Sequence, residues 1–280
     1  SKGEQLWEKG VSAKNVIVAV LDTGVDYNHP ELQGRVVPGY DVADKDNDPM
    51  DRHGHGTHVA GIIGAARNNG EGISGVADCK IMPIKVLGDN GSGTTDSVLE
   101  GIKYAVDHGA KVINMSLGTS DPSIDPVLHM GLEYAYKKGV VVVAAAGNDG
   151  GKVGSPANDP YAIAVSSTSR FWLFEWRSFF SNRGDQIEVA APGGGIWSLL
   201  PVGQSTLGAK QGRSMYGKLS GTSMAAPFVA GEAAMILAQH PNWTVEQVRN
   251  RIRQAVDDKG ARGRDSNYGF GRINLAKALD

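Results

Sequence analysis

The sequence is poor in cysteine and has no long apolar run, and both features narrow what the chain can be. Its 280 residues include one cysteine, Cys79, so an intrachain disulfide is excluded and stability has to come from the core or from bound ions. No segment approaches the roughly 20 consecutive apolar residues of a membrane-spanning helix. The first residues do not resemble a signal peptide. We therefore expect no membrane partner.

An excess of charge of one sign is also absent. The chain has 28 basic and 30 acidic residues, a formal net charge of −2, and no long basic run. Nucleic acid is therefore not an expected partner. Apolar residues make up 41% of the chain, which is enough for a sizeable core, and we expect a monomer.

Short β-branched runs alternate with helical patterns along the chain. Strands are predicted over Val16–Leu21, Val112–Met115, Val140–Ala144 and Ala162–Val165. Helices are predicted after a cap at Thr95–Asp96, over Pro126–Lys138, over Met224–Gln239 and over Thr244–Val256. This alternation predicts an α/β fold, in which a doubly wound, mostly parallel sheet carries helices on both faces. We expect one such domain over residues 1–280.

Three short segments contain an aspartate, a histidine and a serine beside glycine and threonine residues. Asp22 follows an apolar run in Val-Leu-Asp-Thr-Gly, where a strand ends and active sites of such sheets lie. His55 lies in His-Gly-His-Gly-Thr-His, and Ser223 in Ser-Gly-Thr-Ser-Met-Ala-Ala-Pro. A serine hydroxyl needs an imidazole base, which a carboxylate orients. Taken singly, each segment also fits a turn, a helix cap or a packed histidine.

Together, in the order Asp, His, Ser, the segments resemble the subtilisin-like serine protease family. Further landmarks match in order, namely Gly91–Gly93, Asn114–Gly118, Ala144–Asn148 and Val189–Pro192. The resemblance covers nearly the whole chain, and the loop spacings are most similar to those of thermitase-type members. It implies a subtilisin-like fold and a serine endopeptidase of broad specificity that works through an acyl-enzyme.

The resemblance also implies which residues act. The expected catalytic residues are Asp22, His55, Ser223 and Asn148. His55 is the expected base, whereas His58, one helical turn later, is expected to pack inside the helix. Asn148 is expected to stabilise the oxyanion together with the backbone N–H of Ser223.

Two extended edges are expected to hold the substrate strand. The expected substrate-binding residues are Gly91, Ser92, Gly93, Ser116, Leu117, Gly118, Ala145, Gly147 and Gly154. Gly154 stands where a larger residue would narrow the primary pocket. We therefore expect a preference for large apolar or aromatic side chains before the scissile bond.

The segment 41–51 holds five carboxylates in eleven residues. A solvated acidic loop is one interpretation, but the spacing from His55 resembles that of a family calcium loop, and Ca²⁺ takes 6–8 oxygen ligands. The resemblance implies as ligands Asp41, Asp44, Asp46, Asp48 and Met50. A second, structural calcium loop is implied at Glu31, Ala66, Asn69, Glu71 and Ile73. Relatives often have a shorter aspartate in place of Glu31.

The segment Arg170–Phe180 departs from the family pattern, because it contains six of the 19 aromatic residues of the chain. Half of these rings are expected in a core strand. The remainder are expected to form a docking patch at Phe171–Phe180 for a prosegment, an accessory domain or another partner.

Two other functions remain as alternatives. A metallohydrolase could use His53, His55 and His58, although the glutamate of a His-Glu-x-x-His motif is absent. A catalytically inactive binding module of the same fold would normally lack a triad residue. Family members are usually secreted as zymogens, so we expect a mature secreted protein, with an intracellular location left open.

Overall fold

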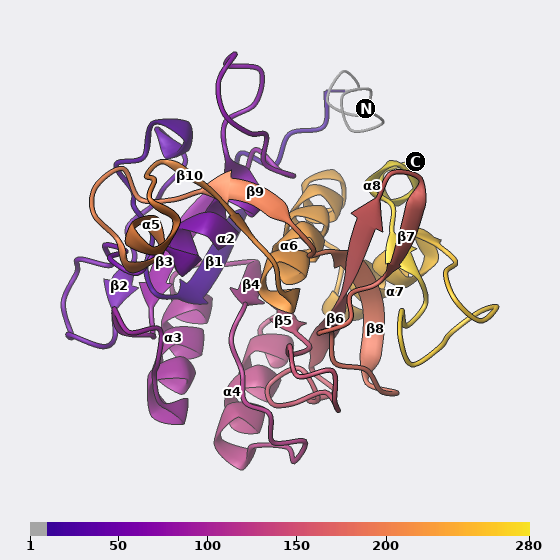
Figure 1. Cartoon of the computed structure of the whole chain (residues 1–280). Helices are drawn as coiled ribbons and strands as arrows, with labels where there is room; N and C mark the ends of the chain where they lie inside the picture. Colours follow the sequence, from indigo (N-terminus) through magenta and orange to yellow (C-terminus); the bar gives the residue numbers. More distant parts are fainter. Residues whose placement is uncertain (1–9) are drawn as a thin grey trace.

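A long, mostly parallel sheet forms the centre of the structure, a computed structural model that describes residues 10–280 (Figure 1). The strand order is β11-β12-β8-β6-β5-β4-β1-β3-β2, and β7 pairs with β6. The central parallel strands are β1 (Ile17–Asp22), β3 (Lys80–Lys85), β4 (Val112–Met115), β5 (Val141–Ala145), β6 (Ala162–Phe171) and β8 (Ile187–Pro192). The shorter strands are β2 (Tyr40–Asp41), β7 (Phe174–Arg177), β11 (Val256–Asp257) and β12 (Arg272–Ile273).

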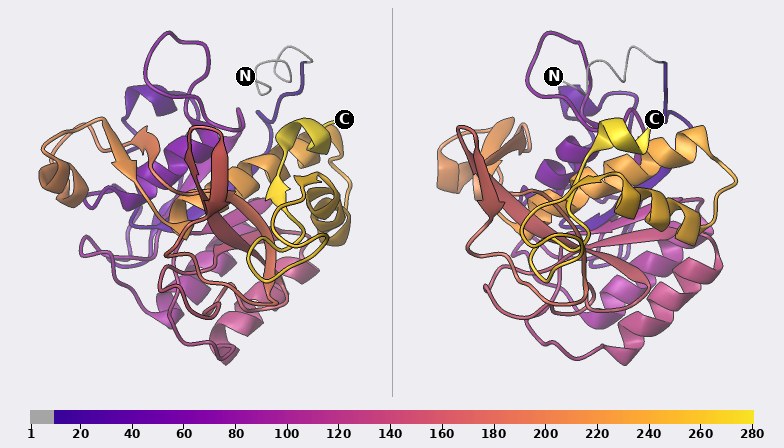
Figure 2. Two further views of the ribbon diagram at one scale, coloured as in Figure 1. Left: turned by 45° about the vertical axis from the view of Figure 1, so that its right-hand side comes forward. Right: turned by 90° about the vertical axis from the view of Figure 1, so that its right-hand side faces the viewer.

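Helices cover both faces of this sheet (Figures 1 and 2). One face packs on α3 (Thr95–Asp107) and α4 (Pro126–Lys137), and the other on α2 (His55–Gly64), α6 (Thr222–Gln239), α7 (Val245–Gln254) and α8 (Leu275–Ala278). The sheet has a hydrophobic core on each face, and alternate residues of β1 pack into one or the other. Val18 and Val20 face α6, whereas Ala19 and Leu21 face α3. The predicted doubly wound α/β fold is confirmed.

Local signals set the helix ends. The predicted cap of α3 is displaced by one residue, because Thr94 accepts the hydrogen bond from the backbone N–H of Ser97. Thr244 and Gln247 form a capping box at the start of α7. Gly139, which follows α4, has a φ of +76°, a conformation that suits glycine at a helix end.

A smaller two-stranded sheet leads into α6. It pairs β9 (Ile196–Leu199) with β10 (Tyr216–Leu219) in antiparallel register, and α5 (Thr206–Gln211) lies between them in the chain. The backbone N–H of Leu207 donates to the carbonyl of His53 over 2.9 Å, which fixes this segment to the loop before α2. A 3₁₀ turn, η1 (Pro30–Leu32), follows β1. Within residues 10–280 no helix combines the length and apolar character needed to cross a bilayer.

Candidate active site

A carboxylate and an imidazole form a pair at the carboxyl end of β1. Asp22, the last residue of β1, is fully buried, and its Oδ1 lies 2.7 Å from Nδ1 of His55, the first residue of α2. The same oxygen accepts a hydrogen bond from the backbone N–H of Thr23 over 2.7 Å. Because a neutral His55 donates its Nδ1 proton to Asp22, its Nε2 is left as a proton acceptor.

The charge of Asp22 sets the protonation of His55. Burial by itself lowers the pKa of His55, but the Asp22 charge and hydrogen bond outweigh burial and raise the pKa above its usual value. The other carboxylate oxygen, Oδ2 of Asp22, is buried and has no hydrogen-bond partner among residues 10–280. A negative charge placed in this way favours the imidazolium that forms when His55 takes a proton.

Asp51 holds the loop that presents His55. It is buried and accepts five hydrogen bonds, from the backbone N–H groups of His53, Gly54 and Thr57 and from two hydroxyls. One hydroxyl belongs to Thr23, beside Asp22, and the other to Thr57 in α2. Asp51 therefore connects the strand end to the helix start. Its position four residues before His55 was the only sequence signal for this role.

Ser223 lies in the first turn of α6, on the same side of the sheet. Its Oγ donates to the carbonyl of Ser116 over 3.2 Å, and Oγ of Ser116 donates back to the carbonyl of Ser223 over 2.8 Å. The structure gives no hydrogen bond between Ser223 and His55 in its described residues. A contact between Ser223 and His55 would require the Ser223 hydroxyl to leave the carbonyl of Ser116, and catalytic hydrogen bonds often tighten only when substrate binds.

Asn148 is oriented by the residue before Ser223. Its Oδ1 accepts from the backbone N–H of Thr222 over 2.7 Å and from the Thr222 hydroxyl over 2.9 Å. The side-chain NH₂ has no hydrogen-bond partner within residues 10–280. Asn148 and Ser223 line one cavity, so the NH₂ group is available to a carbonyl oxygen held there.

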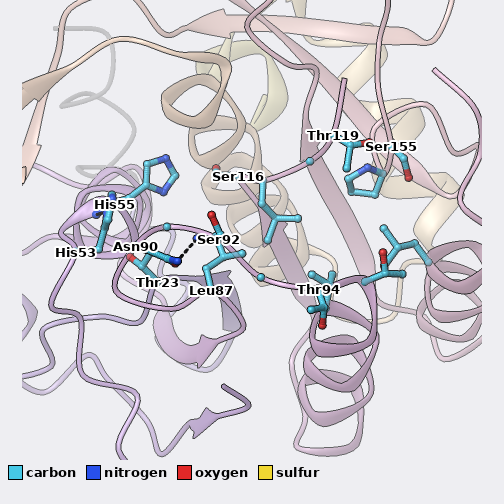
Figure 3. A pocket seen from close by; sticks show the side chains of 18 residues that line it. Thr23, His53, His55, Leu87, Asn90, Ser92, Thr94, Ser116, Thr119 and Ser155 are labelled. Atoms are coloured by element: carbon cyan, nitrogen blue, oxygen red, sulfur yellow. Dashed lines mark hydrogen bonds between the residues drawn. The ribbon is translucent and has the colours of Figure 1, made fainter. Parts of the chain in front are cut away.

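Two cavities meet at the Ser116–Gly118 edge. One, of about 460 Å³, is lined by His55, by Gly91–Gly93 and by Ser116–Gly118 (Figure 3). The other, of about 260 Å³, is lined by Leu117–Ser120, Ala145–Asp149, Thr222 and Ser223. The two cavities share Leu117–Thr119, and between them they bring His55, Asn148 and Ser223 to the same region as the predicted substrate edges.

Gly154 is the exception among the predicted substrate residues. It lines neither of these cavities. A Cβ added there would lie 1.8 Å from the backbone oxygen of Thr119, so glycine is required by close backbone packing and not by pocket width. Asp149, which the sequence analysis missed, lines the smaller cavity and is exposed.

Comparison with known proteins decides the family. The model of the subtilase family matches residues 13–271. The chain belongs to the subtilase family. It is 42% identical to thermitase from Thermoactinomyces vulgaris over 279 residues, covering 98% of this chain and 92% of thermitase. It is 41% identical to the thermophilic serine proteinase of Bacillus sp. (strain AK1) over 275 residues, covering 98% of this chain and 64% of that protein.

Solved structures agree with this assignment. Fervidolysin from Fervidobacterium pennivorans, described as a keratinolytic enzyme related to subtilisin, has a TM-score of 0.88 and 37% identity. The match covers 99% of this chain but 44% of the fervidolysin chain. A protease from Pseudoalteromonas arctica has a TM-score of 0.86 and 34% identity, and the match covers 98% of this chain and 91% of that protease. The subtilisin-like fold is confirmed, and a subtilisin-like serine endopeptidase is the activity that these relatives support.

The other histidines of the subtilase motif have different surroundings from His55. His58 is fully buried in α2, its Nε2 lies 3.2 Å from the carbonyl of Gly217, and burial lowers its pKa to about 4. Nδ1 of His53 accepts from the backbone N–H of His55 over 3.3 Å. His58 is therefore buried in the helix, as expected, and its ring contacts the carbonyl of Gly217.

The acidic loop 41–51 offers oxygen atoms of the kind that calcium binds, but its carboxylates are not gathered around one position in the described residues. Asp41 is buried, its Oδ1 caps the N–H of Asp44, and burial raises its pKa. Asp48 accepts from the hydroxyl of Tyr27 over 2.7 Å. The carbonyl of Met50 lies 3.5 Å from Nζ of Lys85, a cation already present. Residues 10–280 contain no cluster of three or more His, Cys, Asp or Glu side chains arranged for a metal.

The second predicted loop fits a cation better. Glu31 is fully buried; its Oε1 accepts from the Tyr216 hydroxyl over 2.7 Å, and its Oε2 is buried without a partner among the described residues. Asn69 lies in the facing loop, where its Oδ1 accepts from the N–H of Glu71 over 3.2 Å. An unsatisfied buried carboxylate oxygen is costly, and a bound cation would relieve that cost. The longer side chain of Glu31 therefore does not weaken the case for this loop.

Proposed function

We propose that this subtilase hydrolyses peptide bonds in proteins with a triad of Asp22, His55 and Ser223, within a single catalytic domain. The observation that carries the proposal is the 2.7 Å contact between Asp22 and His55, beside a cleft whose wall also holds Ser223. Each member of the proposed triad is present, so an inactive binding module is the less favoured alternative.

The proposed first step forms an acyl-enzyme. Oγ of Ser223 attacks the carbonyl carbon of the scissile bond while Nε2 of His55 takes the hydroxyl proton. The C–N bond then breaks as His55 returns that proton to the leaving amine, and the acyl group stays on Ser223 as an ester. Asp22 stabilises the imidazolium that exists between these two proton transfers.

The proposed second step hydrolyses the ester. His55 takes a proton from a water molecule as the water oxygen attacks the ester carbonyl, and it then returns the proton to Oγ of Ser223. In both steps negative charge develops on the carbonyl oxygen. The free NH₂ of Asn148 and the N–H of Ser223 at the start of α6 are available to stabilise that charge.

We infer a preference for large apolar or aromatic side chains before the scissile bond. The smaller cavity has alanine and glycine walls at Ala145–Gly147, and its one charged lining residue, Asp149, is exposed. Peptides that differ only at this residue test the inference. Faster cleavage after phenylalanine than after lysine is expected, and the reverse order would contradict it.

We also propose that Ca²⁺ stabilises the fold without taking part in the chemistry. The unpartnered Oε2 of Glu31 supports the loop that contains Asn69, whereas the acidic loop 41–51 is supported only by the chemistry of its oxygens. A location outside the cell and maturation from a zymogen are further proposals. A relative named minor extracellular protease Epr supports the first of them.

Hydrolysis of casein by matched variants tests the proposed function. Ser223→Ala is expected to abolish cleavage while circular dichroism shows an unchanged fold, and Ser220→Ala, in the same loop, is the matched control that keeps activity. Full cleavage by the Ser223→Ala protein would remove this residue from the mechanism.

A further inference from the structure

The β6–β7 hairpin carries apolar side chains that the proposed chemistry does not use. It projects from the body of the protein (Figure 2). At its tip, Trp172, Leu173 and Phe174 are 81%, 86% and 75% exposed, and Phe171 and Trp176 are also exposed. The expectation that half of the rings in this segment belong to the core is wrong. Of the six, only Phe180 is partly buried, because the strands run on past the edge of the sheet.

The hairpin has two different faces. Cross-strand pairing places Phe171 opposite Phe174 and Ser169 opposite Trp176, so these four side chains share one face. The other face holds Glu175, whose carboxylate contacts Arg272 at 3.1 Å and Lys259 at 3.5 Å. These ion pairs fix the polar face to the C-terminal part of the chain and leave the apolar face open.

The apolar face packs on the loop between β8 and β9, which is hydrogen-bonded to the segment just before Ser223. Ser169, on that face, packs against Gly194 so closely that a Cβ added to this glycine would lie 2.1 Å from the serine hydroxyl. The neighbouring Gly193 accepts through its carbonyl from the N–H of Gly221 over 2.9 Å. Gly221 is two residues from Ser223. The apolar face and the proposed active site therefore adjoin through one short, directly packed segment.

We propose that this apolar face is an exosite that binds the substrate polypeptide, and that it selects unfolded segments rich in aromatic and aliphatic side chains. The proposal rests on the proposed function, since the occupant is the chain being cut. An extended substrate advances about 3.3 Å per residue. A chain that occupies the cleft and extends beyond it can therefore also contact the hairpin, whereas a peptide that ends within the cleft cannot. Exposed Trp and Phe are the side chains that contribute most to such binding.

A lipid surface fits this hairpin less well than a polypeptide does. Interfacial segments combine apolar side chains with basic ones that meet anionic headgroups. Here Arg170 and Arg177 alternate with the apolar residues and so lie on the opposite face, beside Glu175. The apolar residues also extend from the tip along the side of the hairpin that packs on Gly194, which a bilayer approaching the tip would not reach.

Kinetics on short and long substrates test the exosite. The variant is Phe171→Ser/Phe174→Ser/Trp176→Ser, which removes the rings of the apolar face, and the control is Ile124→Ser/Met130→Ser, which removes exposed apolar side chains elsewhere. For a long unfolded protein rich in Phe and Leu, we expect the variant to raise KM about tenfold, which corresponds to ~1.4 kcal/mol of binding free energy. For a four-residue chromogenic peptide, the variant and the control should both have a KM within about twofold of the parent value.

An unchanged KM for the long substrate would overturn the exosite, and so would an equal rise in KM for both substrates. If KM is unchanged, hairpin-dependent binding to phosphatidylcholine–phosphatidylglycerol vesicles would assign the hairpin to lipid, and hairpin-dependent dimers in size-exclusion chromatography would assign it to a second copy of the chain. A parent protein that fails to cleave the short peptide would instead count against the proposed function. Binding of the long substrate to the Ser223→Ala protein, with and without the hairpin substitutions, gives a readout independent of turnover.

Discussion

We expect Glu232 to make the stability of this protease depend on pH. It lies in the middle of α6, fully buried, and both of its carboxylate oxygens lack hydrogen-bond partners within residues 10–280. Burial raises its pKa from 4.5 to about 8. The folded state therefore binds this proton more tightly than the unfolded state. The contribution of this bound proton to the free energy of unfolding is greatest below pH 4.5, and it is lost as the pH rises through about 8.

The size of this effect follows from the two pKa values. One pKa unit corresponds to about 1.4 kcal/mol, so the change from 4.5 to about 8 corresponds to roughly 5 kcal/mol. For a protein of this size, 1 kcal/mol changes Tm by about 2–4 °C. Loss of the proton should therefore lower Tm by on the order of 10 °C between acidic and alkaline pH.

Glu232→Gln isolates the effect, because the amide has the same shape and no charge. Thermal unfolding is followed by circular dichroism at pH 5, 7 and 9 in a Ser223→Ala background, which prevents self-digestion. We expect the Gln variant to unfold near the parent temperature at pH 5 and well above it at pH 9. Glu100→Gln, at an exposed position of α3, is the control and should follow the parent curve. A Gln variant that loses as much stability as the parent at pH 9 would refute the reasoning.

Three further predictions concern the cleft and the calcium loop. Asn148→Leu should lower kcat by roughly 10² to 10³ with little change in KM, the loss that follows removal of the corresponding oxyanion donor in subtilisin; unchanged turnover would remove Asn148 from the site. Because Asp22 raises the pKa of His55, the acidic limb of the kcat/KM profile should lie above the ordinary histidine value of about 6.5, and Asp22→Asn should move that limb to lower pH; an unmoved limb would show that Asp22 does not set the pKa of His55. A chelator should lower Tm of the parent, measured by calorimetry, and have a smaller effect on Glu31→Gln; equal effects would place the ion elsewhere.

The fold and the proposed triad could be inferred from the sequence because their signals are local. Apolar β-branched runs mark β1, β4 and β5, and a Gly-Thr-Ser segment before an alanine-rich run marks the start of α6. Each triad residue lies inside a short motif, so its position follows once the motif is recognised. The pairing of Asp22 with His55 then needs only that β1 and α2 adjoin.

The remaining features depend on approaches between distant segments. Gly154 is glycine because the backbone of Thr119, 35 positions earlier, lies against it, and no local pattern records that contact. Asp51 reads as one carboxylate of an acidic loop, yet its hydrogen bonds reach Thr23 and Thr57. The exposure of the β6–β7 hairpin could be predicted only in part, since an apolar strand of the core and one that leaves the sheet have the same composition.

Covalent labelling tests the central claim of the account most directly. The parent protein is treated with a fluorophosphonate, and the modified peptide is mapped by mass spectrometry. The account predicts a single modified residue, Ser223, with labelling lost in His55→Ala because the hydroxyl then lacks its base. Labelling at another serine, or undiminished labelling of Ser223 without His55, would contradict it.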